Sequence, residues 1–465
     1  MKKWLDYTFR FLLITIPFTL GVIGFISAGN GTLQSIYCSL CLYGMGQKEL
    51  PPNTLIEIAR WIAPLATAGI LIAIIKAAKR HFQNFVAKFF PHNVAVYGPK
   101  DEKKAMLKQL GIRGIDMAND AVNANCFILI GDEDENFEIY RTQLADKNKD
   151  VYLKCASLPE HAGKGNLHLF CPEETAARVF WEKNSLYDLA NAKNNMLDVV
   201  IVGFEKLGRE VLLSALHGNI FDLNQKITYH IIGEDNGFTD TYHELDKITD
   251  PVIFHPTPVA ENLELIAKAD EVIVTTQKDQ LDTLFMLIHA ISEKQFYVFS
   301  AHMDATSLIA EEFNKTRLIC FDWKKEAMNP ANILREETVY HAKRLNMCWA
   351  GKPDGSDEEA NEKWAEMDTF NRYSNIYAAS YRHTIARKLG TDSLDDKMEM
   401  LAELEHIRWS RYHYLNNWAL GTPENGENKD KPKRIHTCLI PYCDLSEPMK
   451  ENDRKNVRYF LKINK

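Results

Sequence analysis

Several patterns that carry catalytic chemistry are missing from this chain of 465 residues. The zinc-binding pattern His-x-x-Glu-His, the nucleophile motif Gly-x-Ser-x-Gly and a phosphate loop ending in Gly-Lys-Ser/Thr do not occur. The nine cysteines lack the paired Cys-x-x-Cys spacing of a zinc site, and a net charge of −8 provides no basic body for nucleic acid. We therefore expect no enzymatic activity, no catalytic residues, no metal and no nucleic-acid partner.

Charge is also absent from a long N-terminal stretch. Between Phe11 and Gln47 there is no Asp, Glu, Lys or Arg. Residues 11–28 are apolar and long enough to cross a bilayer, which requires about 20 residues in a helix, and residues 58–76 form a second such segment. Because positive charge flanks both ends of this pair, we expect residues 1–90 to form a two-span transmembrane hairpin with an exit helix. The lipid bilayer would be the bacterial inner membrane, with both termini cytoplasmic.

A strand, a glycine turn, a helix and a second strand follow one another between Leu197 and Asp235. This order is typical of the first half of a Rossmann unit, whose turn reads Gly-x-Gly-x-x-Gly. Gly203 and Gly208 hold the first and third glycine positions, but Glu205 replaces the second and brings negative charge towards the pyrophosphate. The cofactor therefore stays open between NAD, another nucleotide and none. The candidate cofactor-binding residues are Gly203, Glu205, Gly208, Glu234, Asp235, Thr275 and Thr276.

Apolar strands alternate with helical segments on both sides of this stretch. The alternation predicts an α/β fold with two tandem Rossmann-like parallel-sheet domains, at residues 91–195 and 196–323. The first domain is degenerate, because its turn begins at Gly98 and has no second glycine.

The second domain resembles RCK domains, the NAD-binding-like regulators of potassium channels and Trk-type transporters. The resemblance is carried by Val199–Gly208, Glu234–Asp235 and Ala269–Thr276. It implies that the Rossmann units pair, assemble into rings and move transmembrane helices when a ligand binds.

Residues 324–392 are polar and helical, and they connect the second sheet to a C-terminal module at residues 393–465. In the connector, Tyr373, Tyr377 and Tyr381 form one helical stripe, which favours core packing over a ligand platform. The module resembles the RyR domain, the repeat domain of ryanodine receptors that also occurs in bacterial proteins. The matching residues are Glu405, His406, Trp409, Trp418, Gly421, His436, Pro441, Tyr442, Leu445, Asp453 and Arg454.

Two uses of the module's aromatic and basic side chains remain open. They are suited to stacking a base and clamping a phosphate, and the RyR resemblance implies nucleotide sensing. For each aromatic residue taken singly, packing in the core of a small domain is favoured. Arg408, Arg411 and His436 are the better candidates for ligand contact. The candidate ligand-binding residues are Arg408, Trp409, Arg411, Tyr412, Trp418, His436 and Tyr442.

Taken together, the sequence predicts a ligand-gated inner-membrane effector or ion channel. Its cytosolic RCK-like and RyR body would sense a small nucleotide-like ligand and move the hairpins. Because two helices cannot enclose a pore, we expect a homo-oligomer, a dimer or tetramer. An antiviral role is suggested by analogy only. The first alternative is a membrane-tethered, NAD-linked regulatory subunit of a separate potassium transporter. The second is an enzyme that uses the cleft of the second Rossmann unit.

Overall fold

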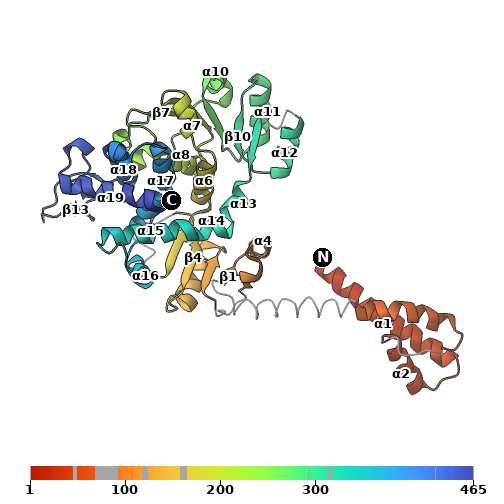
Figure 1. The fold of residues 1–465 in the computed structure, drawn as a ribbon. Coiled ribbons are helices and arrows are strands. Elements are labelled where there is room, and N and C mark those ends of the chain that lie inside the picture. Colours follow the sequence, from red (N-terminus) through yellow and green to blue (C-terminus); the bar gives the residue numbers. More distant parts are fainter. Residues whose placement is uncertain are drawn as a thin grey trace. The chain divides into compact units, whose positions relative to one another are not determined.

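The computed structural model consists of two compact units, Met1–Pro91 and His92–Lys465 (Figure 1). The ranges that the structure describes are residues 2–44, 50–68, 93–117, 124–157, 165–291, 293–312, 317–424 and 426–463.

The N-terminal unit contains helix α1 (Lys2–Ser27), helix α2 (Thr32–Leu42) and a further helix at residues 54–68. These helices pack through small residues: a Cβ on Gly24 would lie 2.7 Å from Ile56 Cγ1, so only glycine permits this approach. The buried core of the unit is formed by Phe25, Cys38, Leu42, Ile56, Ala59 and Ala63.

These helices do not support the predicted membrane hairpin. Within the described ranges, no helix combines the length and the apolarity that a bilayer crossing requires. The two-span hairpin and the inner-membrane location with cytoplasmic termini are therefore wrong as predicted. Of the second predicted span, residues 69–76 lie outside the described residues, as does the predicted exit helix.

The first sheet of the larger unit has five parallel strands in the order β2-β1-β3-β4-β5. Strands β1, β3 and β5 are short, mostly apolar and mostly buried, which is typical of parallel sheets covered by helices. The strands are β1 (Val94–Tyr97), β2 (Gly114–Asp116), β3 (Cys126–Leu129), β4 (Asp150–Lys154) and β5 (Leu167–Phe170). The helices that follow β1 and β3 are α4 (Lys100–Leu110) and α5 (Glu133–Ile139).

The second sheet has six parallel strands in the order β11-β10-β9-β6-β7-β8, which is the doubly wound Rossmann order. Its strands are β6 (Met196–Val202), β7 (Lys226–Ile232), β8 (Val252–His255), β9 (Glu271–Val274), β10 (Phe296–Phe299) and β11 (Leu318–Phe321). Its helices are α6 (Pro172–Lys183), α7 (Tyr187–Ala192), α8 (Lys206–Gly218), α9 (Phe238–Thr241), α10 (Leu263–Lys268), α11 (Gln280–Ala290), α12 (Met303–Glu312) and α13 (Trp323–Ala327). The predicted α/β fold with parallel Rossmann-like sheets is thus confirmed.

The C-terminal part is mainly helical (Figure 1). Its helices are α14 (Pro330–Leu334), α15 (Glu336–Trp349), α16 (Asp357–Ala365), α17 (Thr369–Leu389), α18 (Leu394–Tyr414) and α19 (Glu447–Ile463). A small sheet in the order β12-β14-β13 follows α18, with strands β12 (Ala419–Leu420), β13 (Lys429–Asp430) and β14 (Ile435–His436).

Helix α17 contacts both Rossmann-like domains and the C-terminal module. Tyr373 Oη donates to the Leu169 carbonyl at the end of β5, at 3.2 Å, and Tyr381 Oη donates to the Ile220 carbonyl after α8, at 2.8 Å. The tyrosine stripe therefore joins the sheets to the C-terminal helices.

Candidate functional site

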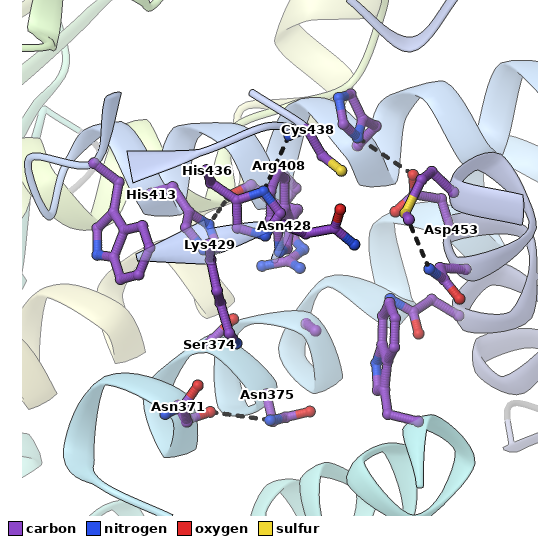
Figure 2. A pocket seen from close by; sticks show the side chains of 18 of the residues that line it. Asn371, Ser374, Asn375, Arg408, His413, Asn428, Lys429, His436, Cys438 and Asp453 are labelled. Carbon is purple, nitrogen blue, oxygen red and sulfur yellow. Dashed lines mark hydrogen bonds and ion pairs between the residues drawn. The ribbon is translucent and has the colours of Figure 1, made fainter. Parts of the chain in front are cut away.

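A cavity of about 480 Å³ lies in the C-terminal module, within the ~300–1,000 Å³ range of small-molecule sites. Helices α17, α18 and α19 and strands β13 and β14 form its walls, and the end of α15 completes them. Figure 2 shows polar side chains from these elements around one space. Its principal lining residues are Phe370, Asn371, Ser374, Asn375, Arg408, Trp409, His413, Trp418, Glu427, Asn428, Lys429, Lys431, His436 and Asp453.

Arg408 is the most deeply placed cation of this cavity, with 2% of its surface exposed. Its Nε and Nη2 donate to the Glu405 carboxylate at 2.7 and 2.8 Å, and Asn456 Nδ2 donates to the same carboxylate at 2.9 Å. Burial lowers the pKa of Arg408, but the nearby Glu405 offsets this, and the net pKa lies above its ordinary value. Arg408 Nη1 has no hydrogen-bond partner in the described part of the chain. One guanidinium edge is therefore fixed, while a second donor remains available.

Aromatic rings also line the cavity. Trp409 and His436 meet edge to face with centroids 4.9 Å apart, and Phe370 stacks on Trp418 at 5.4 Å. Burial lowers the pKa of His413 to about 3 and that of His436 to about 4, so both imidazoles are neutral at pH 7. Because His436 Nδ1 accepts from the Cys438 N–H at 3.0 Å, its proton resides on Nε2.

Two lysines of the β13 segment add positive charge. Lys431 Nζ lies 3.6 Å from the Asp368 carboxylate, whereas the Lys429 ammonium has no ion-pair or hydrogen-bond partner within the described ranges. Burial and the neighbouring Lys431 lower the pKa of Lys429. The acidic lining residues include Asp453, which lies 3.3 Å from the ring of His406. Two cationic donors, one deep and one at β13, thus lack a protein acceptor in the part of the chain that the structure describes.

Four of the seven predicted ligand-binding residues line this cavity together. They are Arg408, Trp409, Trp418 and His436. The cavity also uses residues that were not predicted from the sequence, chiefly His413 on α18 and Lys429 on β13, and the α17 pair Asn371 and Asn375. The spacing of this asparagine pair places both side chains on one helix face, which was a usable signal.

The other three residues lie elsewhere. Arg411 pairs with Asp250 at 2.7 Å in the second Rossmann-like domain. Tyr412 Oη donates to the Phe370 carbonyl at 2.7 Å, and Tyr442 Oη donates to a Glu399 oxygen at 3.1 Å. These three side chains are occupied by intramolecular contacts.

The glycine turn brings the predicted cofactor-binding residues to the carboxyl ends of β6, β7 and β9. Gly203 has φ of +96°, and a Cβ on Gly208 would lie 2.2 Å from the Gly203 carbonyl oxygen, so both positions require glycine. Thr275 Oγ1 donates to the same carbonyl at 2.7 Å and ties β9 to the turn. Thr276 Oγ1 donates to the Lys278 carbonyl at 3.0 Å.

The remaining candidates of the turn do not form an anion cradle. Glu205 is exposed at the start of α8, where a pyrophosphate would lie, and its side chain caps no backbone N–H in the described residues. At the end of β7, Glu234 is exposed, and Asp235 accepts from Thr239 N at 3.1 Å. A carboxylate at the helix start repels a pyrophosphate, so the residues present do not fit an ordinary dinucleotide.

Comparisons with solved structures found similar chains at low identity and low TM-score. A chorismate mutase/shikimate 5-dehydrogenase fusion protein from Clostridium acetobutylicum is 13% identical, with 60% of this chain and 97% of that chain covered and a TM-score of 0.30. A dipicolinate synthase chain from Bacillus halodurans is 11% identical, with 53% and 96% covered and a TM-score of 0.23. No curated protein matches the chain.

These findings correct three predictions. The membrane effector or channel and its alternative, a membrane-tethered regulator of a transporter, are wrong because no described helix can span a bilayer. Of the predicted membrane protein with RCK domains, only the Rossmann-like parallel sheets are confirmed. The expectation that the chain is not an enzyme is contradicted, because both similar structures carry the names of enzymes. TM-scores this low assign no activity to this chain. The C-terminal resemblance stands: residues 388–464 match the family model of the RyR domain.

Proposed function

We propose that the C-terminal pocket binds a small nucleotide-class ligand, meaning a planar ring system that carries a phosphate. The observation that carries the proposal is Arg408, which lines the cavity and whose buried Nη1 has no acceptor in the described residues. A phosphate oxygen is the acceptor that suits a guanidinium best, and an unmet buried donor costs about 1–3 kcal/mol.

The ring system would contact the aromatic wall. Trp409 and Trp418 offer faces for stacking, which is worth about 1–3 kcal/mol per base in other proteins. His436, neutral with its proton on Nε2, adds a donor without adding charge. The amides of Asn371 and Asn375 offer paired donors and acceptors for the edge of a ring.

The test measures the thermal midpoint of the full chain against AMP, ATP, NAD and cyclic dinucleotides. A ligand that binds only the folded protein stabilises it by about 2.7 kcal/mol at 100 times its Kd. We expect at least one nucleotide to raise the midpoint. Arg408→Lys retains a charge beside Glu405 but removes Nη1, and it should abolish most of the increase.

Two further variants separate binding from folding. Lys429→Gln removes the unpartnered ammonium from an exposed side chain and should weaken binding without unfolding the protein. Lys433→Gln removes a lysine that pairs with Glu424 outside the cavity, and it should bind as the wild type does. The proposal fails if no nucleotide shifts the midpoint, or if Arg408→Lys and Lys429→Gln both keep the full shift.

A homo-oligomer, dimer or tetramer, remains a prediction from the sequence. Light scattering of the full chain on a sizing column would test it, and a monomeric mass across micromolar concentrations would contradict it.

A further inference from the structure

A second cavity, of about 420 Å³, lies where the first sheet meets the C-terminal helices. Ala156, which follows β4, and Cys171, which follows β5, contribute to its lining, as do helices α6, α8, α17 and α18. The space outside the carboxyl ends of parallel strands is the usual ligand position in open α/β sheets. Phe370 lines both this cavity and the nucleotide pocket, so one ring contributes to the walls of each.

A buried carboxylate faces this cavity with one oxygen unused. Glu174 begins α6 and has 3% of its surface exposed. Its Oε2 accepts from Arg335 Nη2 at 2.5 Å, while its Oε1 has no hydrogen-bond partner among the residues that the structure describes. Arg178 Nε forms an ion pair with that oxygen at 3.8 Å, which is beyond hydrogen-bond reach. Oε1 therefore keeps capacity for a hydrogen-bond donor.

A second carboxyl group lines the same cavity. Glu210 lies on α8, is half-buried, and makes no ion pair or hydrogen bond within the described ranges. Burial raises its pKa to about 7, and the nearby Glu174 contributes to the increase. Two carboxyl groups with spare acceptor capacity favour a cationic donor, which would also lower the pKa of Glu210.

The cavity also has a cationic side. Arg209 precedes Glu210 on α8, and its guanidinium lies 5.9 Å from the ring of Phe238. Its hydrogen bond to the Asn236 carbonyl is long, at 3.4 Å, and it has no carboxylate partner in the described residues. Lys206, by contrast, is bound to Glu173 at 2.7 Å. Arg209 is therefore the cation that is available to a ligand carboxylate.

Aromatic side chains also line this cavity. Tyr373 and Tyr377 of α17 line the cavity with ring centroids 6.2 Å apart, and Tyr377 stacks on His217 of α8 at 4.4 Å. These rings form an apolar wall beside the carboxyl groups, and aromatic faces also favour cations.

We infer that this cavity binds a small zwitterion of the α-amino-acid class. The ammonium group lies between the Glu174 and Glu210 carboxyl groups, and the carboxylate pairs with Arg209. The ligand's own side chain contacts Tyr373 and Tyr377. This site is independent of the proposed nucleotide pocket and does not require it.

The experiment is calorimetric titration of the full chain with each of the twenty amino acids at pH 8. Putrescine and acetate serve as amine-only and carboxylate-only probes, and the amide and the N-acetyl form of any binding amino acid complete the set. We expect one or more amino acids to bind at one site per chain, and both blocked forms to bind at least tenfold more weakly.

Three variants decide the assignment. Glu210→Gln removes one charge isosterically, Arg209→Gln removes the proposed carboxylate partner, and each should weaken binding at least tenfold. Glu102→Gln, on the exposed surface of α4, is the matched control and should bind as the wild type does. Absence of binding by every amino acid overturns the inference. So does unchanged binding in either cavity variant, and so does putrescine binding as tightly as the amino acid, which would indicate a site for organic cations only.

Discussion

Arg411 and Asp250 form a buried ion pair, with Nη1 and Oδ2 2.7 Å apart, that joins helix α18 to the segment before strand β8. The Asp250 carboxylate also accepts from Ile227 N and from Gln225 Nε2, each at 2.8 Å. This ion pair therefore joins the RyR region to the second Rossmann-like domain. Both oxygens of the Asp250 carboxylate accept hydrogen bonds within the protein. Arg411 joins the two regions of the fold, whereas Arg408, one helical turn earlier, lines the C-terminal pocket.

We predict that Arg411→Leu lowers the free energy of unfolding by about 3–5 kcal/mol, because removing one partner leaves the other charge buried and uncompensated. Urea denaturation of the full chain would measure this. Arg458→Leu is the control: its pair with Glu451 is half-exposed, and such pairs are worth about 0–1 kcal/mol. Equal midpoints for the two variants would show that the Arg411 pair does not join the two regions.

Gly208→Ala should destabilise the fold whether or not the turn binds a cofactor. A Cβ there would lie 2.2 Å from the Gly203 carbonyl oxygen, and backbone cannot yield cheaply at that distance. Gly218→Ala lies on the same helix with no atom within 4 Å of the added carbon, so it should be neutral or stabilising by up to about 1 kcal/mol through helix propensity. Thermal melts of both variants would measure this difference. Equal melting temperatures would show that the turn adjusts to the added carbon at Gly208.

The sequence was sufficient for the sheets. The strand before Gly203 ends in the continuous apolar run Val199–Val202, and the strand before Gly233 is rich in isoleucine. Apolar strands followed by glycine turns are typical of parallel sheets. It was not sufficient for the N-terminus, because an apolar segment predicts burial without specifying the partner. In the structure, the buried apolar residues of α1 and α2 pack with residues 54–68, as Phe25 and Ile56 illustrate.

The site residues were only partly predictable for a similar reason. Arg408 and Arg411 are neighbours on one helix, and their difference lies in their partners. The partner of Arg411 is 161 residues away in the chain, and no local pattern indicates it. Lys429 lies in a polar loop segment whose composition gave no reason to place it beside Arg408.

Glu210 should make stability fall as the pH rises. Burial raises its folded pKa to about 7, above the ordinary value of 4.5, so the folded state retains a proton that the unfolded chain loses. Stability is therefore lost between about pH 4.5 and 7, and Glu210→Gln should remove that loss. Unfolding free energies at pH 5 and pH 8 would test this, and the variant should gain most at pH 8. The charged groups that affect Glu210 are Glu173, Glu174, Lys206 and Arg209.

A variant that responds equally at both pH values would show that Glu210 ionises as it does in water. Glu102→Gln provides the baseline, because its exposed side chain should give the same small effect at each pH.

Lys429 should control the salt dependence of ligand binding in the C-terminal pocket. Its ammonium lacks a protein acceptor in the described residues, so an anionic ligand gains an attraction of about 1 kcal/mol at 4 Å in a watery environment. Lys429→Gln should weaken a stabilising nucleotide roughly fivefold, and it should flatten the fall in affinity between low and high salt, because exposed charges are screened. Titrations at about 50 and 300 mM salt would measure both effects. Lys433→Gln, whose lysine is held by Glu424, should keep the wild-type slope. If Lys429→Gln also kept that slope, the phosphate would be bound by Arg408 alone, deep in the cavity and shielded from added ions.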